Sequence, residues 1–375
     1  MHVVVVGAGA FGGWSALALA RRGVRVTLLD AWGPANARAS SGDETRVLRC
    51  AYGALAHYSE MTARARGLWR QAESAWGLRL FAPVGALFLL QGESVFASQS
   101  REVLGYALEE LVPDDLVRRY PVIAPEGVDG ALLERDAGAL LARRACEAVV
   151  QAFVDGGGDY RRLAARPEEG LRAVRLSDGT ALAADAFVFA CGPWLPALFP
   201  ELLGPWLTPH RQEVLLFGTP PGDARYLEES LPVWVDLGER PIYGIPGDGR
   251  RGFKVADDTR GPAFEPTGGD RVLSAEGLAG ARAFLSLRFP GLARAPLLEA
   301  RVCQYEDTPD RELILDRHPA APDVWLAGGG SGHGFKLAPC VGDLVADSVL
   351  GRREVDPRFS LARFGSAAWR ADTLS

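Results

Sequence analysis

The first thirty residues carry the feature that most constrains the fold, a glycine motif between two strand-like runs and a helix. Residues 3–6 are a run of valines long enough for one buried strand. Residues 15–22 have helical composition, and Gly23 is placed to end that helix. Residues 24–29 predict a second strand, which ends at the acid Asp30. The order of strand, glycine turn, helix, strand and acid predicts a βαβ unit at the start of the chain.

The glycines have the spacing G-x-G-x-x-G at Gly7, Gly9 and Gly12. The first allows a tight turn, the second lets a pyrophosphate approach the backbone, and the third lets the helix pack closely on the strand. The N–H groups at the start of the helix would face the phosphates. Asp30, 23 positions after Gly7, can accept hydrogen bonds from an adenosine ribose. The stretch predicts a dinucleotide site without choosing between FAD and NAD, and a glycine-rich turn without a ligand is the alternative.

The composition excludes several classes of partner. With 375 residues, 48% hydrophobic and 23% charged, the chain predicts two ordinary globular domains. A net charge of −6 gives no reason to expect nucleic acid or an anionic membrane as a partner. The cysteines number five, an odd count, and no two form a C-x-x-C pair, which argues against a disulfide framework or a zinc knuckle. A first strand at residue 3 leaves no room for a signal peptide, and no apolar run is long enough to span a membrane, so we expect a cytoplasmic protein.

Patterns along the chain predict two interleaved domains. Helices are expected at residues 60–73, 102–111, 138–156, 274–289 and 339–350, and a proline-rich connector at 112–128. Strands are expected at 78–90, 187–190, 212–217, 233–236, 242–245, 252–255 and 324–327, with a hairpin over 171–184. The expected fold class is α/β, with a discontinuous Rossmann-type domain at 1–80, 138–204 and 300–375. A strand-rich substrate domain would take 81–137 and 205–299, with the ligand in the cleft between the two domains.

Three motifs point to one family. They are Thr45-Arg46-x-x-Arg49-x-Ala51-Tyr52-Gly53, the run RVCQY that ends at Tyr305, and GGGSGHGFKLAPCVG over residues 328–342. With the glycine motif, they resemble the FAD-dependent amine oxidases of the D-amino-acid-oxidase superfamily, in particular monomeric sarcosine oxidase and the N-methyltryptophan and pipecolate oxidases. The resemblance covers essentially the full length and implies FAD as the cofactor.

The resemblance implies a set of cofactor residues. Cys303 matches the cysteine that carries FAD through a thioether to the flavin 8-methyl group, and a buried structural cysteine is the alternative. The other implied cofactor residues are Gly7, Gly9, Gly12, Asp30, Thr45, Gly192, Gly332, Gly334 and Phe335.

The resemblance also implies roles for three cations. Arg49 and Lys336 match the pair that binds the substrate carboxylate, and Lys254 matches the lysine that activates oxygen. Ordinary surface cations are the alternative. The chain contains two lysines against thirty-nine arginines, and both lysines fall on the positions where the family uses lysine. Since lysine and arginine are not interchangeable, this scarcity favours the functional interpretation.

The sequence does not identify the substrate, because some pocket residues differ from those of sarcosine oxidases. Arg46, Tyr305 and Tyr243 match residues around the flavin ring and pocket, but Asp258 stands where sarcosine oxidases carry a histidine. If Asp258 points inward, it favours a substrate with a second cationic or hydrogen-donating group. A general-base role for His333 is not expected.

The predicted reaction is FAD-dependent oxidation of a secondary amino acid, N-methyl or cyclic, to an imine. Oxygen is the expected acceptor and gives hydrogen peroxide, and we expect a monomer. A dehydrogenase with another electron acceptor is the alternative among enzymes. A non-catalytic dinucleotide-binding scaffold is the alternative from another class.

Overall fold

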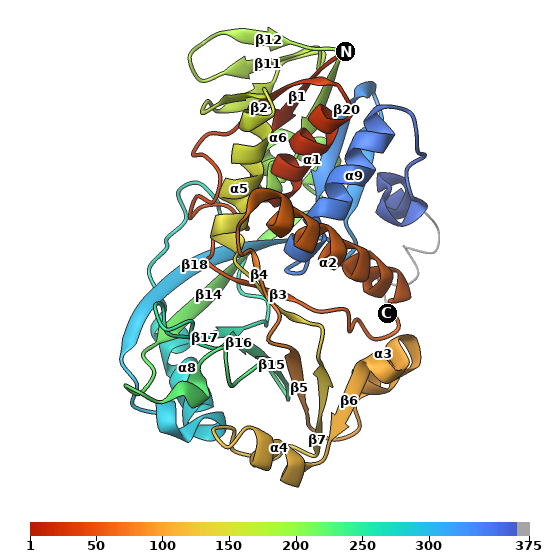
Figure 1. The fold of residues 1–375 in the computed structure, drawn as a ribbon. Helices are drawn as coiled ribbons and strands as arrows, with labels where there is room; N and C mark the ends of the chain where they lie inside the picture. Colours follow the sequence, from red (N-terminus) through yellow and green to blue (C-terminus); the bar gives the residue numbers. More distant parts are fainter. Residues whose placement is uncertain (366–375) are drawn as a thin grey trace.

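The computed structural model describes residues 1–365, which form an upper and a lower region, each built around one large sheet (Figure 1). None of the helices in this part of the chain is both long enough and apolar enough to cross a membrane. The α-helices are α1 (Ala10–Arg21), α2 (Ala56–Trp76), α3 (Val95–Leu104), α4 (Pro113–Arg119), α5 (Ala142–Asp155), α6 (Leu195–Leu198), α7 (Pro200–Leu203), α8 (Ala275–Arg288) and α9 (Ala338–Val349).

The upper region contains a six-stranded sheet in the order β19-β20-β13-β1-β2-β9. Its strands are β1 (His2–Val6), β2 (Arg25–Leu29), β9 (Asp159–Arg161), β13 (Ala186–Phe189), β19 (Ile314–His318) and β20 (Ala321–Gly328). The central strand β1 pairs in parallel with β2 and β13. Val3 and Val5 pack against α1, α5 and α9, whereas Val4 and Val6 pack on the other face. Both faces of β1 are covered, which explains why Val3–Val6 are all apolar and do not alternate with polar residues.

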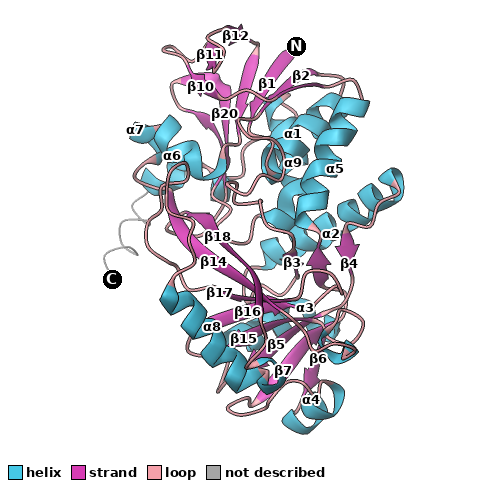
Figure 2. Ribbon diagram, turned by 90° about the vertical axis from the view of Figure 1, so that its left-hand side faces the viewer, coloured by secondary structure: helices cyan, strands magenta, loops and turns pink. Residues whose placement is uncertain are grey.

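The lower region contains an eight-stranded sheet in the order β18-β14-β17-β16-β15-β5-β7-β6. Its strands are β5 (Ala86–Leu90), β6 (Leu108–Leu111), β7 (Gly130–Glu134), β14 (Thr208–Phe217), β15 (Val233–Leu237), β16 (Pro241–Ile245), β17 (Phe253–Asp257) and β18 (Leu297–Asp307). All neighbours are antiparallel except β15 and β5. The long pair β14 and β18 runs from this sheet toward the upper region (Figure 2). Helix α8 covers the sheet through a core that includes Trp234, Phe253 and Phe289.

Two three-stranded sheets complete the fold. One has the order β10-β11-β12, with β10 (Ala165–Pro167), β11 (Ala173–Leu176) and β12 (Ala181–Ala183). The other has the order β3-β8-β4, with β3 (Arg46–Leu48), β4 (Phe81–Ala82) and β8 (Gly138–Leu140). The α/β class and the hairpin over residues 171–184 are therefore confirmed. The strand β3 begins at Arg46, so the second small sheet positions the first predicted site motif.

Three local predictions are wrong at their edges. The helix expected at 102–111 ends at Leu104, because Gly105 has a positive φ of 55°, and β6 follows as an edge strand. The connector expected at 112–128 contains α4, which has a proline at its start, acids in its first turn and arginines in its last. The helix expected at 138–156 begins only with α5 at Ala142, since β8 takes the first three residues.

Candidate functional site

The loop after β1 has the geometry that a diphosphate requires. Gly7 has φ +104°, and a Cβ there would overlap the carbonyl oxygen of Ala190. A Cβ on Gly12 would overlap the Gly7 carbonyl, so only glycine lets α1 pack this closely on the loop. Helix α1 starts after Gly9 with no side-chain cap. Its first N–H groups are therefore available to an anion.

Asp30 ends β2 beside this loop. Its Oδ2 accepts the Ala8 N–H at 2.7 Å, and its Oδ1 accepts the N–H groups of Trp32 and Gly33 at 2.8 and 2.7 Å. The carboxylate thus holds the glycine loop and the following turn together. Its place at the edge of the cavity described next fits the predicted contact with a ribose.

An elongated cavity, here the dinucleotide cavity, runs from the glycine loop toward the lower sheet. Its walls include the predicted cofactor residues Gly7, Gly9, Asp30, Gly192, Gly332, Gly334 and Phe335, with Trp32, Ser40, Arg46, Cys191, Tyr305 and Glu306 among the others. Gly12 lies behind the loop, and Thr45 and Cys303 do not line this cavity. A Cβ on Gly332 would come within 2.9 Å of the Tyr305 ring. A glycine-rich wall with free helix N–H groups at one end fits an extended dinucleotide.

A second cavity, here the cationic cavity, adjoins the first. It is lined by Arg46, Arg49, Tyr52, Tyr58, Tyr243, Asp258, Arg260, Tyr305, Asp310, Arg311, Glu312, Gly332, His333, Phe335 and Lys336, together with Ser331 and several apolar residues. Four residues line both cavities: Arg46, Tyr305, Gly332 and Phe335. A group bound in the dinucleotide cavity would meet a small molecule in the cationic cavity at these four residues, which form the junction.

Arg49 and Lys336 enter the cationic cavity from segments 287 positions apart. Within residues 1–365, neither cation has an acidic side chain within ion-pair distance. The Arg49 guanidinium lies 4.7 Å from the centre of the Tyr52 ring, and Lys336 Nζ lies 5.0 Å from it. Burial, followed by the charge of Arg49, lowers the pKa of Lys336. Charges that are enclosed without a carboxylate partner are energetically costly, so an anionic ligand would be bound favourably between Arg49 and Lys336.

A chain of hydrogen bonds fixes Lys336. Its Nζ donates to the Tyr52 hydroxyl at 2.8 Å, and that hydroxyl lies 3.3 Å from His333 Nδ1. His333 Nε2 is 3.0 Å from the Arg311 carbonyl, which can only accept. His333 therefore carries its proton on Nε2, and its Nδ1 accepts from Tyr52. Since burial lowers the pKa of His333 to about 3, the ring is neutral and acts as a structural link.

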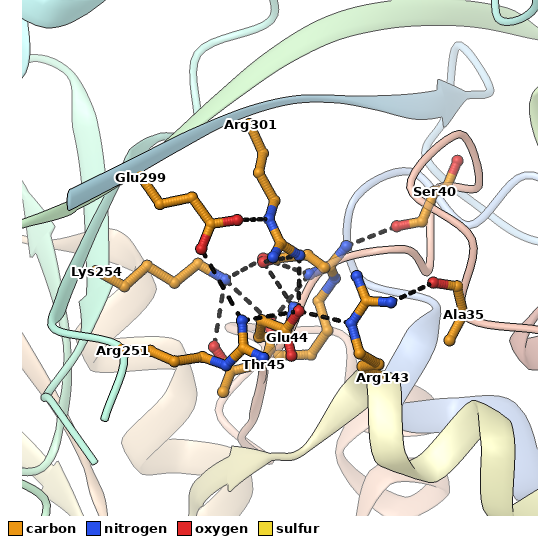
Figure 3. A network of polar contacts seen from close by, with 11 residues as sticks. Ala35, Ser40, Glu44, Thr45, Arg143, Arg251, Lys254, Glu299 and Arg301 are labelled. Atoms are coloured by element: carbon orange, nitrogen blue, oxygen red, sulfur yellow. Dashed lines mark hydrogen bonds and ion pairs between the residues drawn. The ribbon is translucent and has the colours of Figure 1, made fainter. Parts of the chain in front are cut away.

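Lys254 lies on β17 and shares its partner Asp43 with Arg46, in an ionic network shown in Figure 3. Its Nζ donates to Asp43 Oδ2 and, at 3.0 Å, to the Thr45 carbonyl. Asp43 also accepts from Arg46 Nη1 at 2.7 Å. Burial alone would raise the pKa of Asp43, but the charges of Lys254 and Arg46 outweigh it and hold this pKa far below its usual range. Burial lowers the pKa of Lys254, and Asp43 opposes that shift.

Glu44 extends the same network. Its carboxylate forms ion pairs with three arginines, Arg143 at 2.6 Å, Arg301 at 2.9 Å and Arg251 at 3.1 Å (Figure 3). These arginines come from α5, β18 and the segment before β17, so the loop that carries Thr45 and Arg46 is held from both regions. The sequence reasoning missed both acids. The adjacent pair Asp43-Glu44 just before Thr45-Arg46 was the available signal, but their partners lie far away in the chain.

Cys303 lies on β18, paired with Gln212 on β14. Its thiol is buried in a small cavity that it shares with Arg46, Tyr243 and Tyr305. Burial raises the pKa of Cys303, and the nearby charge of Arg46 opposes the shift. The thiol is therefore next to the junction residues but is not itself part of the junction.

Glu306, directly after Tyr305, is a third residue that the sequence did not reveal. It lines the dinucleotide cavity, is 8% exposed and accepts a hydrogen bond from the Ser40 hydroxyl. Burial raises its pKa to about 7, and the neighbouring Asp307 adds to the shift. A carboxyl directly after the motif tyrosine was the signal in the sequence.

The protonation of Glu306 makes stability depend on pH. Because the folded chain holds this proton up to about pH 7 and the unfolded chain releases it near the ordinary glutamate pKa of 4.5, stability falls as pH rises between these values. The loss is complete above pH 7 and amounts to roughly 3 kcal/mol. We expect Glu306→Gln to remove this slope. Unfolding free energies of the cofactor-free protein from pH 4.5 to 8 will test it, and parallel curves for both proteins would contradict the prediction.

Comparisons with known proteins agree with this geometry. Residues 2–348 match the family described as DAO, FAD dependent oxidoreductase. Monomeric sarcosine oxidase from Bacillus sp. strain B-0618 is 30% identical, over 94% of this chain and 93% of that protein. N-methyl-L-tryptophan oxidase from Salmonella newport is 28% identical, over 96% of this chain and 97% of that protein. The crystal structure of L-proline dehydrogenase from P. horikoshii has the same fold, with a TM-score of 0.83 and 20% identity over 97% of both chains.

The family match spans more than nine tenths of the sequence, and it agrees with the glycine loop, the dinucleotide cavity and the motifs that line the junction. The family predicted from the motifs is confirmed. The chain belongs to the DAO family of FAD-dependent oxidoreductases.

Proposed function

We propose that this protein oxidises a secondary amino acid, N-methyl or cyclic, to an imine, with oxygen as the final acceptor and hydrogen peroxide as a product. The observation that carries the proposal is the pair Arg49 and Lys336, two cations that have no acidic partner within residues 1–365 and lie in a cavity that adjoins the dinucleotide cavity. When an arginine guanidinium and a second positive charge bind the substrate carboxylate, the carbon next to that carboxylate is held in one orientation.

When bound, FAD would supply the hydride-accepting chemistry. Residues of the glycine loop, with Asp30 and Gly192, would hold the dinucleotide, and the junction residues Arg46 and Tyr305 would border its reactive end. Arg49 and Lys336 would bind the substrate, and Lys254 would provide a fixed positive charge for oxygen. In this proposal the dinucleotide domain comprises 1–80, 138–204 and 300–375, of which 366–375 lie outside the described residues, and the substrate domain comprises 81–137 and 205–299.

The names of the relatives support a secondary amine as the substrate, since one relative is called a sarcosine oxidase and another an N-methyl-L-tryptophan oxidase. The name monomeric sarcosine oxidase also supports our expectation of a monomer. The test is an anaerobic screen in which N-methyl, cyclic and D-amino acids are added to the flavin-loaded protein and loss of the flavin absorbance is followed. Bleaching by a secondary amino acid is expected, and its absence throughout the screen would overturn the proposal.

Admission of oxygen to the bleached protein separates an oxidase from a dehydrogenase. The oxidase reoxidises rapidly and forms one peroxide per flavin, whereas a dehydrogenase stays reduced until an artificial acceptor is added. Lys254, which is buried beside Asp43 and donates to the Thr45 carbonyl at 3.0 Å, supports the oxidase.

We further propose that Cys303 carries FAD as a thioether. Attachment would replace the S–H bond and one C–H bond of the 8-methyl group by an S–C bond. The two electrons would be left on the flavin, and oxygen would remove them. The shared small cavity of Cys303, Arg46 and Tyr305 supports this position, since Arg46 and Tyr305 border the junction.

We expect Cys303→Ala to bind flavin that acid denaturation releases into the supernatant, whereas wild-type flavin stays with the precipitated chain. Cys191→Ser is the matched control, because Cys191 also lines the dinucleotide cavity. Retention of the covalent flavin in Cys303→Ala, together with its loss in Cys191→Ser, would move the attachment to Cys191. Release from the wild type would exclude a covalent link altogether.

A further inference from the structure

Asp258 follows the last residue of β17 and lies on the same side of the strand as Lys254. Side chains alternate along a strand, so Lys254 and Asp258 share one face and Asp257 has the other. Asp257 forms an ion pair with Arg240. The Asp258 backbone N–H donates to the Pro241 carbonyl at 2.8 Å, which fixes the position of the residue.

The Asp258 carboxylate is only partly neutralised. Its Oδ1 accepts the Tyr305 hydroxyl at 2.9 Å and lies 3.7 Å from Arg260 Nη1. Arg260 makes its closer ion pair with Asp307, at 2.9 Å. Within residues 1–365, Oδ2 makes no hydrogen bond, and 42% of the side chain is exposed at the wall of the cationic cavity. One carboxylate oxygen is therefore available to a ligand of this cavity.

The position of Asp258 places it next to the reacting end of the cavity. Its partner Tyr305 is one of the four residues that line both cavities, so Asp258 is one hydrogen bond away from the junction. The same cavity holds Arg49 and Lys336. Arg49 and Lys336 could bind a carboxylate, and Asp258 beside the junction could bind an ammonium group. Together they complement a zwitterion, the form that a secondary amino acid takes near neutral pH.

Other acid–base groups in the cavity are already engaged, and among them Asp310 forms an ion pair with Arg363 at 2.6 Å. Glu312 accepts the Tyr58 hydroxyl at 2.7 Å, and His333 is neutral and hydrogen-bonded at both nitrogens. Burial raises the pKa of Asp258, and the charge of Arg260 is the main opposing influence. The charged and titratable groups that face Asp258 are Arg260, Tyr305, Tyr243, Arg49, Arg311 and Lys336.

We propose that Asp258 accepts a proton from the ammonium group of the substrate and so produces the neutral amine that is oxidised. This inference rests on the proposed function. The N–H bond breaks with its electron pair left on nitrogen, and the proton forms an O–H bond on Oδ2. With FAD bound, the cofactor would supply the hydride-accepting chemistry for this neutral amine, and water would hydrolyse the oxidised product. Asp258 returns its proton to water through the cavity.

The experiment compares Asp258→Asn with the matched control Asp257→Asn, which removes the same charge one residue away on the opposite face of β17. The substrates are N-ethylglycine and N-(2,2,2-trifluoroethyl)glycine, whose fluorinated amine is largely neutral at pH 7. When a longer amino acid is the better substrate, the same two N-substituents are placed on it. The rate of flavin reduction divided by the substrate Kd is measured without oxygen from about pH 6 to about pH 9.

We expect Asp258→Asn to lose activity toward the ethyl compound by about tenfold for each pH unit below the pKa of its amine. Wild type, Asp257→Asn and Asp258→Glu should keep a flatter profile. The fluorinated compound needs no deprotonation. For it, the rate of flavin reduction divided by Kd in Asp258→Asn should therefore be within about threefold of the wild-type value. Asp258→Ser replaces the amide variant if that variant does not fold.

Equal losses for both compounds, or a wild-type pH profile in Asp258→Asn, would overturn the inference and leave the proposed function intact. If no secondary amino acid reduces the flavin of the wild type, the proposed function fails and this inference fails with it. A purely structural role of Asp258 would lower both rates at every pH, which the fluorinated compound would reveal.

Discussion

Replacing Lys254 by methionine is expected to slow reoxidation of the reduced flavin by oxygen by roughly 100-fold, the scale seen when a preorganised charge-stabilising group is removed. Reduction of the flavin by substrate should stay within a few-fold of the wild type. The reason is that Lys254 does not line the cationic cavity and lies buried against Asp43. The electrostatic interaction of a charge with its surroundings is stronger in such a buried position than in water. Negative charge that develops on oxygen would be stabilised there without reorganisation.

Both half-reactions are measured on the same protein by stopped-flow, so each serves as the control for the other. Lys254→Arg keeps the positive charge next to Asp43 and should recover much of the oxygen rate. A fall of equal size in both half-reactions would show that the substitution disturbs the site as a whole. The oxygen role of Lys254 would then be rejected.

The second large effect is expected when either Arg49 or Lys336, the two cations proposed to bind the substrate carboxylate, is removed. We expect Arg49→Ala and Lys336→Met each to raise the Kd of the amino-acid substrate by roughly 10- to 100-fold, because each removes a charge-assisted hydrogen bond. Lys336→Met should not lower the unfolding temperature, since this lysine is buried among residues that give it no acidic partner within residues 1–365. Loss of binding without loss of stability is the signature of a ligand site.

The matched control for these variants is Arg118→Ala, which removes an exposed arginine from α4. A second control lies in the substrate: an N-methyl amine that lacks the carboxylate should be affected little by either substitution. Titrations followed through the flavin spectrum give the Kd values. An unchanged Kd for the amino acid in both variants, or equal losses for the amine and the amino acid, would refute carboxylate binding by this pair.

The local parts of the fold could be predicted because their causes are local. Four consecutive valines, the glycine spacing and the acid at the end of β2 are close together in the chain, and each has a steric reason that needs no distant partner. The errors arose where a short pattern fits two structures. Leu108–Leu111 fits a helix continuation until pairing with β7 makes it an edge strand.

The sequence alone was enough to predict the dinucleotide loop and the family, and it directed attention to the two lysines, whose roles stay predictions. It could not show that Asp43 pairs with Lys254 across 211 positions, that Arg49 and Lys336 lack acidic partners in the described part of the chain, or that Asp258 faces the cavity with one oxygen available there. The physical reason is that charge and hydration at a side chain depend on what surrounds it in space. The packing of β17 and β18 against the loop of residues 35–46 decides those surroundings, and periodicity along the chain reports only which face of its own element a residue occupies.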